Sequence, residues 1–168
     1  MATDSLGREW QVATIQIDVH MPDSFDLNCI NESGEKERIV MIHAAIMGSV
    51  ERLMSVLIEH FAGAFPVWLS PVQATILPIT EDQNSFAENI GKRLNDAGIR
   101  VEINSNNETL GKKIRQAELE KVPYILIVGE KEVQAEAVAI RKRGDGDMGQ
   151  MKLEELIETM CKEIITKK

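Results

Sequence analysis

The sequence predicts an α/β protein, with a mixed sheet flanked by helices in its second part and a small antiparallel sheet followed by one helix in its first part. Two patterns lead to this prediction. Residues 73–165 alternate short aliphatic runs with amphipathic stretches at helical spacing, which is typical of a sheet covered by helices. Residues 12–42 hold short strand-like runs joined by short turns, which favours antiparallel pairing.

The first part of the chain has the pattern of three strands and a helix. We expect strands at residues 12–18, 25–30 and 38–42, the last of them apolar enough to be buried on both faces. Ser49 is a suitable N-cap for the helix that follows, and Gly63 is suited to end it. Because the apolar residues of this helix form a wide stripe, we expect it to be buried against a sheet.

The second part follows a connector at residues 65–71 that contains two prolines. Such a stiff segment favours a domain boundary, so we expect domains at residues 1–69 and 70–168. Expected strands lie at 73–79, 99–103, 124–128 and 135–141, expected helices at 84–97, 110–120 and 153–165, and a glycine-rich loop at 144–147.

Charge is distributed unevenly along the chain. The net charge of −8 is not typical of a protein that binds nucleic acid without specificity. Residues 1–69 hold four Lys and Arg against ten Asp and Glu, whereas residues 70–168 hold 15 against 17. The second part can therefore bind RNA if its cations share one face.

Cysteine usage and hydropathy favour a soluble protein. Cys29 and Cys161 lie far apart and lack metal-binding spacing, which is typical of reduced thiols in the cytosol. Neither an N-terminal signal-peptide pattern nor an apolar run of about 18 residues occurs. We expect a cytoplasmic protein that does not span a membrane.

The chemistry-bearing residues leave several alternatives open. No phosphate-loop, dinucleotide-binding, nucleophile-elbow or HExxH pattern occurs, which argues against a self-contained nucleotide or nucleophile site. His43 can be a hydrogen-bonded core residue or a metal ligand. Arg52 can be an ion-paired surface residue or a contact to a phosphate or base. Residues 141–143 can be a solvated strand end, or can form a basic face together with Lys112, Lys113 and Arg115.

Several different motifs follow one another along nearly the whole chain. The first part contains Gly7-Arg8-Glu9-Trp10-Gln11, Thr14-Ile15-Gln16-Ile17-Asp18, and Val40-Met41-Ile42-His43 followed by Gly48-Ser49-Val50-Glu51-Arg52. The second part contains residues 62–73, Asn107-Glu108, Gly111-Lys112-Lys113-Ile114-Arg115 and Gly129-Glu130-Lys131-Glu132-Val133. Together these motifs resemble those of threonyl-tRNA synthetases, and the segment ending at Arg52 resembles the third signature motif of class II synthetases.

The resemblance implies roles for four residues of the first part. It implies that Gln11 and Gln16 line the aminoacyl-adenylate pocket and that Arg52 packs against ATP. It also implies that His43 is one of three protein ligands of a catalytic zinc ion. The residue after His43 is Ala44, where the family has an arginine.

In the second part, the resemblance implies an anticodon-binding domain. Asn107, Arg115, Glu132 and Arg141 are then the residues that contact the anticodon bases or their surroundings. Amide, guanidinium and carboxylate groups suit the recognition of splayed RNA bases. The chain departs from the family at three neighbouring positions: Asn104, Asn106 and Thr109 stand where it has Asp, Arg and Lys.

The resemblance implies a function for the whole enzyme and a smaller one for this chain. We expect the C-terminal portion of a threonine–tRNA ligase, a homodimer that uses ATP with Mg²⁺ to attach threonine to tRNA(Thr). The first two class II motifs and the other zinc ligands do not occur in these 168 residues. We therefore expect this portion alone to bind tRNA without catalysis. The alternatives are a free-standing truncated paralogue that is a non-catalytic tRNA-binding module, and a structural accessory subunit.

Overall fold

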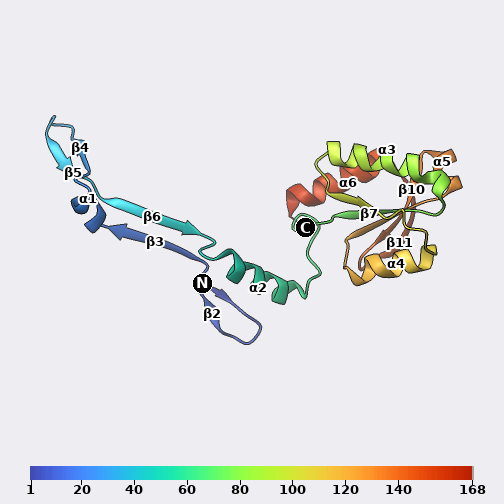
Figure 1. Cartoon of the computed structure of the whole chain (residues 1–168), viewed down its shortest axis with the longest axis horizontal. Coiled ribbons are helices and arrows are strands. Elements are labelled where there is room, and N and C mark those ends of the chain that lie inside the picture. The colour runs from blue at the N-terminus through green and yellow to red at the C-terminus, as the bar shows by residue number, and fades with distance from the viewer. Residues whose placement is uncertain (168) are drawn as a thin grey trace. The chain divides into compact units, whose positions relative to one another are not determined.

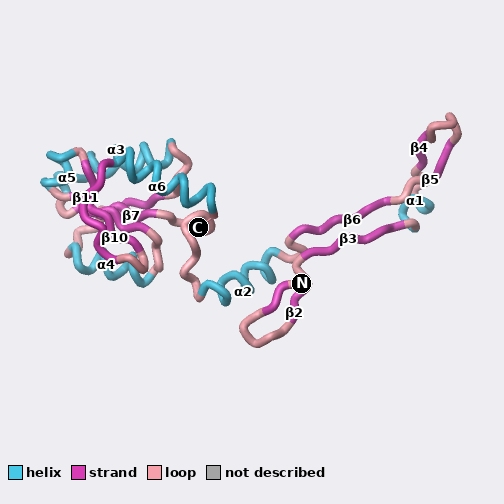
Figure 2. Tube along the Cα trace, turned by 180° about the vertical axis from the view of Figure 1, so that it is seen from behind, coloured by secondary structure: helices cyan, strands magenta, loops and turns pink. Residues whose placement is uncertain are grey.

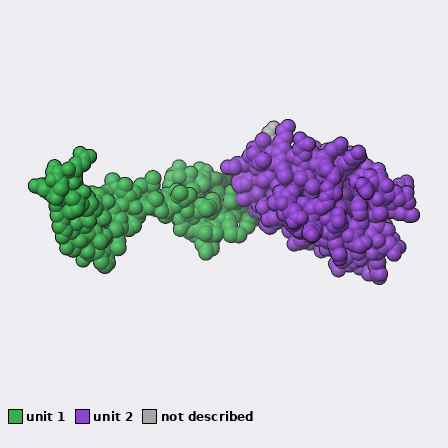
Figure 3. All heavy atoms as spheres, turned by 90° about the horizontal axis from the view of Figure 1, so that it is seen from above, with its two compact units in different colours: residues 1–62 green, residues 63–168 purple. Residues whose placement is uncertain are grey.

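A computed structural model describes residues 1–167. The chain separates into two units, residues 1–62 and the described residues from Gly63 onward, which Figure 3 draws in green and purple. The boundary expected at residues 69 and 70 falls inside the second unit. Each unit is built from its own elements.

The first unit consists of short antiparallel ladders and two helices (Figure 2). Strand pairing is antiparallel in each of its three ladders, β1–β2, β3–β6 and β4–β5. A short connection joins β4 to β5 as expected, whereas β3 and β6 pair across the intervening residues 19–40. The expected strand at 38–42 is wrong as a single element, because β5 ends at Arg38 and β6 begins at Met41. The elements are β1 (Ala2–Thr3), β2 (Glu9–Trp10), β3 (Ala13–Asp18), α1 (His20–Ser24), β4 (Asn28–Ile30), β5 (Lys36–Arg38), β6 (Met41–Ile46) and α2 (Val50–Phe61).

The apolar face of the β3–β6 ladder is open to solvent. Ile15 is 79% exposed and Ile46 is 82% exposed, and Ile17 and Ile42 are also exposed. Helix α2 has no buried residue. The expectation that residues 38–42 and this helix are buried is therefore wrong within the described chain. A ladder or helix buries its apolar face only against a second layer, and no described element covers these faces.

The second unit is a five-stranded mixed sheet with helices on both faces (Figure 1). The strand order is β11-β10-β9-β7-β8, with β7 parallel to β8 and β9, and with β10 antiparallel to β9 and β11. Its elements are β7 (Ala74–Pro78), the short 3-10 helix η1 (Glu81–Gln83), α3 (Asn84–Asp96), β8 (Val101–Ile103), α4 (Leu110–Leu119), β9 (Tyr124–Val128), α5 (Glu130–Ala135), β10 (Ala137–Lys142), β11 (Gly146–Lys152) and α6 (Leu153–Thr166). The predicted mixed sheet is confirmed.

Two predicted segments differ from the structure near the end of the sheet. The strand expected at 135–141 is the end of α5 followed by β10, and Glu136 separates them in the left-handed conformation, with φ of 48°. In the loop expected at 144–147, residues 144–145 form a turn and residues 146–147 already belong to β11. Glycine-containing residues 146–152 have weak strand propensity, but pairing with β10 along their length makes them a strand.

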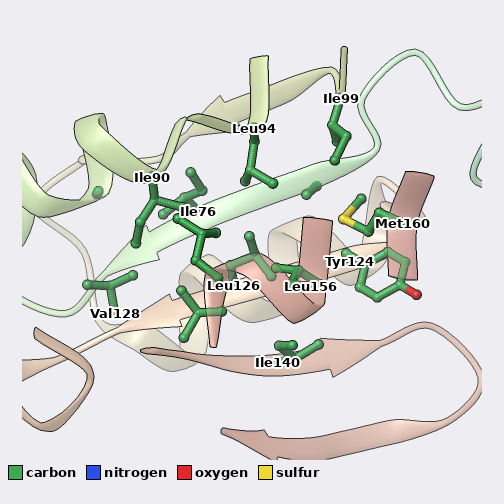
Figure 4. Close-up of a cluster of buried hydrophobic side chains, with 14 of the residues drawn as sticks. Ile76, Ile90, Leu94, Ile99, Tyr124, Leu126, Val128, Ile140, Leu156 and Met160 are labelled. Atoms are coloured by element: carbon green, nitrogen blue, oxygen red, sulfur yellow. The ribbon is translucent and has the colours of Figure 1, made fainter. Parts of the chain in front are cut away.

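The two faces of the sheet are covered unequally. A large apolar cluster fills the space between the sheet and helices α3 and α6 (Figure 4). A smaller cluster lies beneath α4, and its strand side chains come from β7 and β9, namely Leu77, Ile125 and Ile127. On the α4 side, helix packing therefore covers the β7–β9 half of the sheet, while β10 and β11 remain accessible there.

Two arginines hold the connector against the second unit. The guanidinium of Arg100 donates to the backbone oxygens of Trp68, Ser70 and Pro71 at 2.7–3.1 Å. The guanidinium of Arg143 donates to the carbonyls of Ala64, Phe65 and Lys121. These bonds explain why residues 63–69 belong to the second unit, although their prolines favoured a boundary here.

Candidate nucleic-acid interface

An accessible sheet surface lies on the α4 side of β10 and β11. Side chains alternate between the two faces of a strand, and Val138 and Ile140 of β10 belong to the large core beneath α3 and α6. Ala139 and Arg141 therefore point to the α4 side, as does Gln150 of β11, which pairs with Ala139. We call the surface formed by Ala139, Arg141 and Gln150 the open face.

Arg141 links the open face to helix α4. Its side chain is 37% exposed, and its Nη2 lies 3.5 Å from Oε1 of Glu118 on α4. A cavity of about 360 Å³ adjoins this pair, and its lining includes Ile125 and Gly144. Arg115 is exposed and lies one turn before Glu118, on the same side of α4. Arg115 and Arg141 therefore lie on two elements joined by one ion pair.

Glu132 borders the open face from helix α5. It is 8% exposed, and both of its carboxylate oxygens accept hydrogen bonds from the protein. The backbone N–H of Gly129 donates to Oε2 at 2.9 Å, and Nε2 of Gln150 donates to Oε1 at 2.5 Å. Because Gln150 pairs with Ala139, two residues before Arg141, the structure brings Glu132 and Arg141 to one surface.

Asn107 occupies a different position from the other three predicted RNA contacts. It lies exposed in the loop between β8 and α4. Among the described residues, no hydrogen bond or ion pair joins it to the open face. A loop position lets the side chain reach a ligand from the side of the α4 N-terminus, but it leaves Asn107 less fixed than Glu132.

Of the two alternatives, a shared basic face that includes Lys112, Lys113 and Arg115 does not form, because these residues point in different directions. Lys113 is 4% exposed, and its Nζ donates to the backbone oxygen of Pro78 at 3.0 Å. It lies one turn before buried Ala117, so helical spacing turns it toward the sheet. Lys112 instead pairs with Glu108 on the surface, at 2.6 Å.

Residues 141–143 are likewise divided among three environments. Lys142 points to the opposite side of the sheet from Arg141, where its Nζ pairs with Glu163 and lies 5.2 Å from the ring centroid of Tyr124. Burial lowers the pKa of Arg143, whose guanidinium is held by the connector carbonyls. Of these three residues, Arg141 alone belongs to the open face.

The other flank of α4 has a different electrostatic character. A cavity of about 220 Å³ lies there against β8, and two carboxylates, Glu102 and Glu120, are part of its lining together with Asn104 and Asn106. A polyanion is repelled by such a surface. Charge therefore favours the open face over this flank as the RNA-binding surface.

In the first unit, Arg52 and Gln11 are in contact. The guanidinium of Arg52 donates to the backbone oxygen of Gln11 at 3.2 Å and lies 5.5 Å from the ring centroid of Trp10. The Asp4 carboxylate holds this ring in place by accepting a hydrogen bond from Trp10 Nε1 at 2.8 Å. Bonds from Trp10 and Arg8 lower the pKa of Asp4 to about 2. Sequence patterns did not indicate this cluster.

His43 and Gln16 face each other across the β3–β6 ladder. His43 Nε2 lies 3.0 Å from Oδ2 of Asp18, and the pKa of Asp18 is lowered first by the backbone N–H of Met21 and also by His43. A zinc site needs three or four protein ligands. Over residues 1–167 no group of three His, Cys, Asp or Glu residues could hold a metal ion. The described residues therefore do not fit a zinc ion by themselves.

Sequence patterns did not indicate two residues that shape the open face, Glu118 and Gln150. Glu118 is one of many surface carboxylates on amphipathic helices, and its pairing with Arg141 depends on how α4 packs on β7 and β9, beside β10. Gln150 lies just beyond the expected loop, in a segment for which no element was predicted. Alternation against Val138 would have placed it, had β11 been recognised.

Comparisons with known proteins agree on the family. Residues 73–163 match the model of the anticodon binding domain, and residues 1–61 match that of the tRNA synthetase class II core domain (G, H, P, S and T). Similar curated proteins are the threonine–tRNA ligases of Acetivibrio thermocellus, 52% identical over 164 residues, and of Carboxydothermus hydrogenoformans, 50% identical over 165. Each match covers 98% of this chain and 26% of the relative, so the chain spans about a quarter of the length of these relatives.

A solved structure is also similar to this chain. It is the RNA binding domain of threonyl-tRNA synthetase from Cryptosporidium parvum, with a TM-score of 0.83 and 35% sequence identity, covering 95% of this chain and 41% of that one. Within residues 1–167, no helix is long and apolar enough to cross a membrane. The chain belongs to the threonyl-tRNA synthetase family, of which it contains the anticodon binding domain and a segment of the class II core domain.

Proposed function

We propose that the open face binds the anticodon loop of tRNA(Thr). The observation that carries this proposal is that Arg141 and Glu132 border one uncovered sheet surface beside a cavity. Proteins recognise single-stranded RNA by hydrogen bonds to the edges of splayed bases. The guanidinium fork of Arg141 suits the acceptors of a base edge, and the Glu132 carboxylate suits its N–H donors.

Arg115 and Asn107 have supporting roles in this proposal. Arg115 is exposed on α4, beside the pair of Glu118 and Arg141, where it can contact a phosphate or a base. Asn107 can reach the RNA from the loop before α4. The domain arrangement is also part of the proposal: a class II segment up to about residue 69, then the anticodon-binding domain.

We further propose that the whole protein attaches threonine to tRNA(Thr) at the expense of ATP with Mg²⁺, as a cytoplasmic homodimer. Support comes from the ligases that match nearly all of this chain. Gln11, Gln16 and Arg52 would then line the adenylate pocket, and His43 could serve as one zinc ligand only within a larger ligand set. The matching relatives are ligases, so nothing specific favours a non-catalytic paralogue.

The test is a titration of the chain with anticodon stem-loops. Cognate and anticodon-swapped loops are compared at two salt concentrations for wild type, Arg141→Met and Glu132→Gln. We expect each variant to lose about 1–3 kcal/mol of cognate binding free energy and to discriminate less at one anticodon position. Lys162→Met is the control, because Lys162 is exposed on α6, on the other side of the sheet.

A further inference from the structure

The carboxylate of Glu132 is held from two sides. On one side the N–H of Gly129, the N-cap residue of α5, donates to Oε2. On the other side the amide of Gln150 reaches Oε1 from β11, 18 residues away in sequence. Rotation of this carboxylate would break at least one of the two bonds, so its orientation is fixed before any ligand arrives.

The bond from Gln150 is not needed for helix capping. The bond from the N-cap N–H of Gly129 goes to Oε2, whereas Gln150 bonds the other oxygen, Oε1, from β11. What Gln150 adds is a second donor to a carboxylate that is 8% exposed, and burying a carboxylate without hydrogen-bond partners is costly. Since Gln150 itself is exposed on the open face, this second bond lies at the surface where RNA would bind.

The chemistry of the donor also fits recognition of a base. An amide donates a hydrogen bond to a carboxylate and leaves the carboxylate ionised. Each carboxylate oxygen has two acceptor positions, and the protein fills one on each. One position per oxygen therefore remains for the N–H donors of a nucleobase, and bonds to an ionised acceptor are strong.

We infer that Gln150 is a positioning residue that orients the Glu132 carboxylate for a base edge bearing N–H donors. It thereby contributes to specificity at the anticodon position that Glu132 reads. This inference rests on the proposed function, because it acts through Glu132. It predicts that Gln150 controls discrimination between RNAs more than total affinity for RNA.

The test uses the full chain with Gln150→Met, which keeps the approximate length of the side chain and removes the donor. Cognate stem-loop and loops changed at each anticodon position are titrated, and the ratio of dissociation constants is measured. We expect this discrimination ratio to fall about tenfold at one position, as expected for the loss of a hydrogen bond to a charged group. Gln134→Met is the matched control, because Gln134 on α5 also donates to a glutamate, Glu130, at 3.4 Å on the surface. It should leave every ratio unchanged.

Two further variants separate positioning from other roles. Gln150→Lys retains a donor for Glu132, so the discrimination ratio of this variant should lie within about threefold of the wild-type ratio. This holds even if the added positive charge raises the affinity for every RNA. In a Glu132→Gln background, Gln150→Met should cause no further loss of discrimination, since there is no carboxylate left to orient. Thermal melting of each variant shows whether it is folded.

Each unfavourable outcome has a distinct meaning. If Glu132→Gln leaves all ratios at the wild-type value, the proposed role of Glu132 in base reading fails. If Glu132→Gln relaxes discrimination but Gln150→Met does not, the inference about Gln150 fails and the proposed function stands. Independent, additive effects of the two substitutions, or loss of discrimination in Gln150→Lys equal to that in Gln150→Met, also overturn the positioning role.

Discussion

Arg141 on β10 and Glu118 on α4 form an ion pair at the margin of the open face, with Nη2 and Oε1 3.5 Å apart. Both side chains are partly exposed, and such pairs contribute only about 0.2–1 kcal/mol. A phosphate or a base edge can therefore compete with Glu118 for the guanidinium. The pair holds Arg141 near the position where RNA would meet it, while its carboxylate opposes the approach of a polyanion.

Replacing Glu118 tests this balance. We expect Glu118→Gln to tighten binding of every stem-loop by about two- to fivefold. The substitution removes one negative charge beside Arg141, and it removes the ion pair that competes with RNA for the guanidinium. The measurement is titration at low salt. Glu158→Gln on α6 is the control, since Glu158 is an exposed carboxylate beyond the opposite face. Weaker binding by Glu118→Gln would instead mean that Glu118 orients Arg141 for recognition.

Lys112 and Lys113 should behave differently although they are neighbours. Lys113→Met leaves the Pro78 carbonyl without its donor and should lower the free energy of unfolding by about 1–3 kcal/mol. Lys112→Met removes only the surface pair with Glu108 and should change the free energy of unfolding by about 0.5 kcal/mol or less. Urea unfolding followed through Trp68 in a Trp10→Phe background reports on the second unit. Equal stability of the two variants would contradict the buried role of Lys113.

The connector should depend on the fork shape of Arg100. Arg100 bonds the carbonyls of Trp68, Ser70 and Pro71 from two nitrogens, Nε and Nη2, whereas lysine has a single nitrogen and cannot place donors at both positions. We therefore expect Arg100→Lys to speed protease cleavage within residues 63–71 by about five- to thirtyfold, corresponding to about 1–2 kcal/mol of lost local stability. Arg93→Lys is the control, because Arg93 makes only a surface pair with Glu154. Unchanged cleavage in Arg100→Lys would show that other contacts hold the connector.

The exposed apolar face of the β3–β6 ladder in the first unit should make the 168-residue chain self-associate. Replacing Ile15 and Ile46 with Thr keeps β-branched side chains that suit a strand, but it reduces exposed apolar surface. We expect less binding of a hydrophobic dye and less self-association in sedimentation, with no change in unfolding of the second unit. Leu119→Thr is the control, because Leu119 is an exposed apolar residue outside the ladder. The same dye signal in the double variant and the wild type would argue that this face is covered in solution.

Local patterns predicted most of the second unit. Strands 73–79 and 124–128 and helices 84–97, 110–120 and 153–165 correspond to β7, β9, α3, α4 and α6. The helices carry apolar residues at helical spacing, and the two strands are short apolar runs buried on both faces. Local patterns failed for α5 and β11. The six residues of α5 are too few for a helical period to be recognised, and β11 depends on its pairing with β10.

The sequence by itself determined the family, the α/β class and which residue types could meet RNA, because motifs and periodicity are local properties of the chain. Only the tertiary structure decided which of those residues share a surface. Lys113 and Arg141 have the same charge, yet Lys113 is buried against Pro78 and Arg141 reaches the open face. The hydrogen bond from Gln150 to Glu132 joins a strand to a helix 18 residues away. Such contacts follow from strand order and register, which no single segment encodes.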